Sequence, residues 1–245
     1  MKYYSLNEHL TELKNRLFKV LVTFIVGFIV CYYFSDNIYD ILLQPLAKTA
    51  HTNFRKIIYT GLTEAFFTYI KLATFGAFIV TFPVIALQVY LFIAPGLYKG
   101  EKKIAALMLF SAPILFWAGA IFVYLLVMPK AWHFFVSFEN FNNTIPIILE
   151  ARISEYLSLI IQLVTAFGIA FQLPIVIIIA NLLNLLSVSQ LRQKRRIAIV
   201  VNFIVAGVLT PPDVLSQLAL ALPLLLLYEF SILICQFITN KRTHA

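Results

Sequence analysis

Two glutamates carry the clearest chemical potential in this sequence, because each stands among basic residues beside an apolar stretch. Glu12 is followed by Lys14 and Arg16, and Glu101 is followed directly by two lysines. A carboxylate is the natural partner of a cation, and it binds the guanidinium fork of arginine through two parallel hydrogen bonds. We therefore expect Glu12 and Glu101 to receive a cationic ligand at a membrane surface.

Three further polar residues lie inside apolar stretches, where ionisable groups often mark a functional site. They are Lys71, Gln172 and Glu229. Glu64 precedes Lys71 by seven residues and shares its helix face, so the two can pair or snorkel. A structural role is favoured for Lys71, and both a structural and a functional role stay open for Gln172 and Glu229.

Signatures of catalysis and of metal binding are absent from the sequence. It has neither a His-Glu-x-x-His nor a Cys-x-x-Cys motif, and no glycine-rich phosphate loop. The four histidines are scattered through termini and loops, without ligand spacing. We expect no enzyme activity, no metal and no other cofactor. The two cysteines, Cys31 and Cys235, are expected at opposite membrane faces and therefore unpaired.

Composition places the chain in a membrane. Of its 245 residues 61% are hydrophobic and only 12% are charged, whereas soluble domains have about one-quarter charged residues. The net charge of +8 is explained by basic loops that fix topology, so we expect no nucleic-acid partner. We predict one domain over residues 1–245.

Apolar segments of about 20 residues predict membrane-spanning helices. The predicted all-α fold has six of them, at about Leu17–Phe34, Ala65–Ile93, Ile104–Met128, Tyr156–Leu186, Ile197–Leu209 and Ser216–Ile238. The fifth, at about 20 Å of helix, is shorter than the usual hydrocarbon core. A five-span protein with a re-entrant fifth segment is therefore the alternative.

The distribution of basic residues predicts the orientation. Thirteen lysines and arginines fall in the two termini and the second and fourth connections, and five fall in the other connections, so both termini should be cytoplasmic. Four spans carry an internal proline, Pro83, Pro113, Pro174 and Pro223. Proline bends helices, and we expect a curved assembly with a concave face. The alternative explanation is that prolines are simply common in membrane helices.

Five segments in order resemble the TatC family, the multispanning receptor of the twin-arginine protein translocase. The resemblance covers nearly the whole chain. The segments are His9–Leu17, Thr63–Leu72, Phe92–Glu101, Leu209–Gln217 and the pair Tyr228 and Glu229.

The resemblance implies a receptor for twin-arginine signal peptides of folded cargo proteins. Its signal-binding residues would be Glu12, Glu101, Lys14, Phe92, Leu97 and Tyr98. Structural turns would contain Pro45 and the outer turn Pro211, Pro212 and Asp213. Two residues depart from the family pattern. Lys14 stands where many members have arginine, and Gln172 stands where many have glutamate.

The resemblance also implies partners and a location. The partners would be small single-span translocase subunits of the TatA and TatB type, together with further copies of the chain and the lipid bilayer. The location would be the bacterial cytoplasmic (inner) membrane, with an organellar inner membrane as an alternative.

Simpler interpretations stay open beside the resemblance. Glu12 is spaced to pair with Arg16 on one helix face, and Glu101 suits the N-terminus of the third span. A secondary transporter of a small solute or ion is the alternative function.

Overall fold

The protein folds as a bundle of helices in the computed structural model, which describes residues 6–49, 57–94, 101–140, 149–210 and 214–243. The helices are α1 (Leu6–Tyr33), α2 (Ser35–Thr49), α3 (Glu64–Ile93), α4 (Glu101–Phe122), the π-helical η2 (Val123–Val127), α5 (Met128–Val136), α6 (Ile153–Ala170), α7 (Leu173–Leu182), α8 (Val188–Gln193), α9 (Arg195–Leu209) and α10 (Val214–Thr243).

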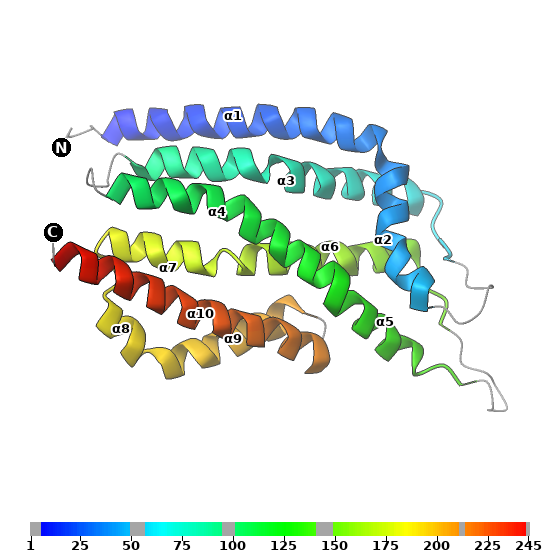
Figure 1. Ribbon diagram of the computed structural model, residues 1–245. Helices are drawn as coiled ribbons and strands as arrows, with labels where there is room; N and C mark the ends of the chain where they lie inside the picture. The colour runs from blue at the N-terminus through cyan, green and yellow to red at the C-terminus, as the bar shows by residue number, and fades with distance from the viewer. Residues whose placement is uncertain (1–5, 50–56, 95–100, 141–148, 211–213, 244–245) are drawn as a thin grey trace.

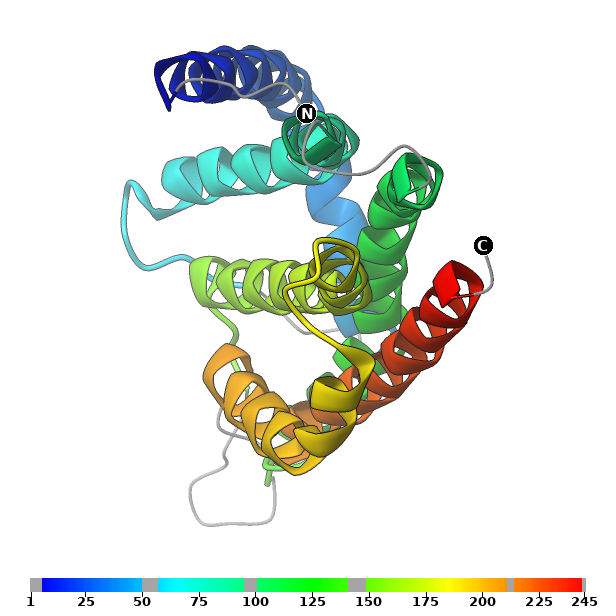
Figure 2. The ribbon, with the colours of Figure 1, turned by 90° about the vertical axis from the view of Figure 1, so that its left-hand side faces the viewer.

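The long helices run beside one another, and α2 crosses them at one end (Figure 1). The described chain begins in α1 and finishes in α10 at the same end of the bundle. Seen from that end, α1 lies at one extreme against α3, and α8 and α9 lie at the other (Figure 2). An isolated parallel bridge between Ile58 and Arg152 joins two connections at the end where α3 begins.

Five helical segments are long and apolar enough to cross a membrane. They are Leu10–Tyr33, Glu64–Ile93, Ala106–Val136, Ile153–Leu182 and Gln217–Asn240. The fifth predicted span corresponds to α9, whose 15 residues extend about 22 Å. That length falls short of a hydrocarbon core of about 30 Å. The described chain therefore supports a multispanning helical protein with five full-length spans and one short helix.

The predicted fourth span is not one continuous helix. It is divided into α6 and α7 by a turn at Phe171 and Gln172. Pro174 follows this turn at the start of α7. Proline lacks an N–H and its ring collides with the carbonyl four residues earlier, which here belongs to Ala170, the last residue of α6. The other three span prolines lie inside α3, α4 and α10.

The connection between the first two predicted spans contains the helix α2, which the apolar pattern of the sequence does not predict. Pro45 is not in a turn: it lies inside α2 and is buried. Because Pro45 has no N–H, the carbonyl of Ile41 loses its usual partner four residues on. The Tyr124 hydroxyl donates to that carbonyl at 2.7 Å. A side chain of η2 thus supplies the donor that the proline removes.

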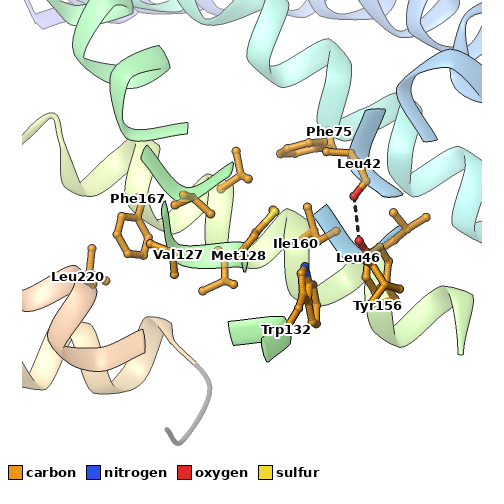
Figure 3. Packing of buried hydrophobic residues seen from close by; sticks show 14 of the residues in the cluster. Leu42, Leu46, Phe75, Val127, Met128, Trp132, Tyr156, Ile160, Phe167 and Leu220 are labelled. Atoms are coloured by element: carbon orange, nitrogen blue, oxygen red, sulfur yellow. Dashed lines mark hydrogen bonds between the residues drawn. The ribbon is translucent and has the colours of Figure 1, made fainter. Parts of the chain in front are cut away.

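The larger core cluster lies where α2 meets α3, η2, α5 and α6, and it extends to α9 and α10 (Figure 3). Trp132 stacks on Tyr156 with ring centroids 4.8 Å apart. The Tyr156 hydroxyl donates to the carbonyl of Leu42 at 2.9 Å. These contacts fix α2 across the end of the bundle. A second cluster joins α4, α7, α8 and α10.

Candidate functional site

Glu12 lies on α1 and is paired with a base of its own chain. Both the Nε of Arg16, at 3.1 Å, and its Nη2 donate to Oε1 of Glu12. The same Nη2 donates to the carbonyl of Leu91 at 3.0 Å, near the end of α3. The structure therefore contains the simpler alternative for Glu12, an ion pair with the base four residues further along α1. Arg16 also ties the first half of α1 to α3.

The second oxygen of Glu12, Oε2, has no hydrogen-bond partner among the residues that the structure describes. The side chains of Glu12 and Arg16 are only 25% and 19% exposed. A carboxylate has about four lone-pair positions, and Arg16 fills only those on one oxygen. The pair thus leaves a partly desolvated acceptor at this end of the bundle.

Glu101 is the first residue of α4, and its side chain lies outside the described part. The start of α4 is at the same end of the bundle as the first half of α1 (Figure 1). Phe92 is partly buried in the last turn of α3. Leu97 and Tyr98 lie outside the described residues, as do Pro211, Pro212 and Asp213.

Lys14 is exposed on α1. It is two residues from Glu12 and from Arg16, and residues at that spacing do not share a helix face. Lys14 therefore points away from the ion pair. Its place in the predicted binding site depends on the ligand reaching around α1.

Glu229 is occupied by a structural ion pair. Nη2 of Arg195 lies 2.7 Å from its Oε2, which links the start of α9 to α10. Beside it the Tyr228 hydroxyl donates to the carbonyl of Leu191 at 2.8 Å, and this bond pins α8 to α10. Both side chains of the ion pair are about half exposed, so its own energy is on the order of 1 kcal/mol or less.

The side-chain amide of Gln172 joins the turn between α6 and α7 to helices α4 and α6. Its Nε2 donates to the carbonyl of Ala112 in α4 at 3.0 Å and, more weakly, to that of Gly168 at 3.4 Å. Gln172 also borders an apolar groove of about 400 Å³ between α3, α4 and α7. None of the residues that line this groove carries a charge.

Lys71 and Glu64 do not pair with each other, which was one of the two possibilities that the sequence left open. Nζ of Lys71 donates to the Ser158 hydroxyl at 2.9 Å. Oε1 of Glu64 accepts from the Ser154 hydroxyl at 2.7 Å. Both serines belong to α6, far away in sequence. Only the packing of α3 on α6 brings these groups together, so sequence spacing could not reveal them.

Two close contacts at the single crossing of α4 and α6 position the helices that carry these groups. A Cβ atom added to Gly119 of α4 would lie 2.7 Å from the carbonyl oxygen of Phe167 in α6. One added to Gly168 would lie 2.5 Å from the ring of Phe116. Small residues of this kind let helix backbones approach closely in membranes. The α4–α6 contact thereby sets the distance from Ala112 to Gln172.

These features define an all-helical membrane protein of several spans, with polar side chains bonded across its helix ends and apolar residues between. The model of the family described as Sec-independent protein translocase protein (TatC) matches residues 8–223. A protein of that name from Rickettsia prowazekii (strain Madrid E) is 64% identical over 243 residues, which are 99% of this chain and 97% of the relative.

Further relatives agree. A TatC protein from Magnetococcus marinus is 44% identical over 235 residues, 96% of this chain and 85% of the relative. A crystal structure of the twin-arginine translocase receptor TatC in DDM superposes with a TM-score of 0.79 and 35% identity, covering 93% of this chain and 99% of that one. The chain therefore belongs to the TatC family. It is a multi-pass membrane protein of a bacterial translocase, and the resemblance seen in the sequence is confirmed.

Proposed function

We propose that this chain is the receptor subunit that binds twin-arginine signal peptides through Glu12 and Glu101. The observation that carries the proposal is Oε2 of Glu12, which has no hydrogen-bond partner among the described residues. It belongs to a partly buried pair at the bundle end where α4 begins with Glu101. A solved relative of the same fold is named a twin-arginine translocase receptor. A paired cationic motif would meet one acid from α1 and one from α4.

Arg16 has a positioning role in this proposal. It holds Oε1 of Glu12 and anchors α1 to the carbonyl of Leu91, so Oε2 is presented in a fixed direction. An incoming guanidinium would bind Oε2 without displacing Arg16. Arg16 also offsets part of the negative charge, so Glu101 must contribute the second half of the recognition.

The energetics require more than two ion pairs. A partly desolvated pair contributes about 2 kcal/mol, and two of them do not overcome the cost of association. The apolar segment of the signal peptide would supply the remainder by packing against an apolar membrane-facing surface. The arginines then fix register, and lysine is a weaker substitute because it lacks the fork.

Crosslinking of a twin-arginine signal peptide to the membrane-embedded chain tests this role. Glu12→Gln combined with Glu101→Gln should reduce crosslinking at least tenfold, since about 1.4 kcal/mol corresponds to a factor of ten. The matched control is Glu155→Gln, which removes another acid paired with an arginine of the same chain, Arg152. Undiminished crosslinking in the double variant would reject the proposal.

We also propose that the end holding Glu12 faces the cytoplasm of a bacterial inner membrane, with both termini there. The basic residues of α1, of the start of α4 and of the α8–α9 region gather at this end, and cytoplasmic connections are rich in lysine and arginine.

The short helix α9 is proposed to dock the single-span partner subunits. Large apolar side chains cover its surface and are exposed, among them Ile197, Val200, Ile204 and Val208. Its length mismatch with the bilayer favours association. Cysteine pairs between residues 200–208 and a partner helix should form disulfides at one helical face. A partner that crosslinks at no position along this stretch would argue against docking there.

The apolar groove between α3, α4 and α7 gives no support to the alternative function of a solute carrier, because the residues that line it are uncharged.

A further inference from the structure

Lys71 is an exposed cation inside a membrane-spanning helix. Its ammonium group has three N–H donors, and one of them bonds to the hydroxyl of Ser158 at 2.9 Å. The Ser158 hydroxyl donates in turn to the carbonyl of Ser154, so it must accept from Lys71. The bond therefore fixes the direction of the lysine side chain along the α3–α6 contact.

Two donors of Lys71 have no partner in the described parts of the chain, and none of the described acids lies within ion-pair distance. Glu64 is unavailable, because its Oε1 bonds to Ser154 and its Oε2 accepts from the backbone N–H groups of Thr60 and Gly61 at 2.9 and 3.1 Å. An ammonium group facing hydrocarbon in this state is costly. An anion from outside the chain would remove that cost.

The depth of Lys71 indicates which anion is in reach. The 30 residues of α3 extend about 45 Å, roughly 15 Å more than the hydrocarbon core. If both ends project equally, the boundary lies about 7 Å from Glu64, whereas Lys71 is about 10 Å along the helix. Its Cα is thus about 3 Å inside the hydrocarbon. Helical side chains tilt toward the N-terminus, so Lys71 snorkels toward the lipid phosphates.

We propose that Lys71 and Ser158 form a binding site for the phosphate of an anionic phospholipid, in the leaflet at the end of the bundle where α3 begins. The free donors of Lys71 bind the phosphate oxygens, and Ser158 holds the ammonium toward the crevice between α3 and α6. An anionic headgroup is favoured over a zwitterionic one, whose own cation would repel the lysine. This site is separate from Glu12, which lies at the opposite end of the bundle.

Native mass spectrometry of the purified full-length chain tests the proposal. The protein in mild detergent is mixed with phosphatidylglycerol or with phosphatidylcholine at equal concentration, and bound lipids are counted. The wild type and Lys71→Arg should retain one phosphatidylglycerol that Lys71→Gln loses by at least fivefold. Ser158→Ala keeps the Lys71 cation but removes the hydroxyl that orients it, and this variant should show an intermediate loss of bound phosphatidylglycerol. Lys130→Gln is the matched control, because it removes another exposed lysine from a helix at the same end of the bundle.

A second measurement separates lipid binding from a folding defect. Phosphatidylglycerol should raise the unfolding temperature of the wild type and of Lys130→Gln, and should leave that of Lys71→Gln unchanged. Equal retention of both lipids, or equal loss in Lys130→Gln, would overturn the site. Displacement by inorganic phosphate at matched concentration would show that no acyl chains are recognised. A carbodiimide crosslink from Lys71 to a partner subunit's carboxylate in membranes would assign the site to a protein instead.

Discussion

Two tyrosine hydroxyls donate to neighbouring carbonyls of α2, and one of them replaces a donor that a proline removes. Tyr124 serves the carbonyl of Ile41, which Pro45 leaves without its helical donor, and Tyr156 serves that of Leu42. The Tyr156 bond is buried, whereas the Tyr124 bond is more exposed. Losing a buried hydrogen bond costs more than losing an exposed one, at which water can replace the donor.

Tyr156→Phe is therefore expected to lower the free energy of unfolding by about 1–2 kcal/mol. Tyr124→Phe, the matched control, should cost about 0.5 kcal/mol or less because water can replace the hydroxyl. Unfolding of both variants in the same detergent, followed by circular dichroism or differential scanning fluorimetry, measures the difference. A Tyr124→Phe variant as unstable as Tyr156→Phe would show that burial does not decide the strength of these bonds.

At the scale of elements, the α4–α6 crossing depends on glycine at two positions. The atom that faces Gly119 is a backbone oxygen, which cannot move without shifting α6, and the ring that faces Gly168 is fully buried against Phe82. Forcing extra atoms into such a contact costs about 1–3 kcal/mol. The crossing also sets the bond from Gln172 to Ala112, so its effect extends to the turn between α6 and α7.

Gly119→Ala and Gly168→Ala should each lower the unfolding temperature. Gly61→Ala is the control, because the nearest atom to its added Cβ is 3.5 Å away, an ordinary contact distance. The measurement is thermal unfolding of all three variants in one detergent. If Gly61→Ala shifted the transition as far as the other two, close helix approach would not be the cause.

For the whole molecule, the positions of the basic residues predict a membrane orientation that the helical geometry alone does not set. Reporter fusions give the test, with alkaline phosphatase active only outside the cytoplasm. A fusion after Leu62 should be active, and fusions after Lys103 and after Thr243 should be inactive. Activity at both ends of α3 would contradict a span there, and the reverse pattern would invert the orientation.

The apolar spans were predictable from sequence because hydrocarbon thickness fixes their length. The predicted span Ala65–Ile93 differs from α3 by one residue at its start. α2 was missed because Asp36, Asp40 and Pro45 interrupt its apolar pattern, and it is stabilised by tertiary contacts that a single segment does not reveal.

The candidate site was only partly predictable, for a related reason. The spacing of Glu12 and Arg16 indicated a local pair, and the structure has it. The bond from Arg16 to Leu91, and those from Lys71 and Glu64 to serines of α6, join residues at least 75 positions apart. Such contacts form only when the helices pack, so the local spacing of residues in the sequence does not predict them.

The position of α1 at the edge of the bundle has a consequence for biosynthesis. Only 6% of its apolar stretch is buried within the protein, and it packs mainly on α3. Because α1 leaves the ribosome before α3, it must reside in lipid without this partner until α3 is made. Its later docking joins two spans that are each already inserted, so this step of assembly needs no further crossing of the bilayer.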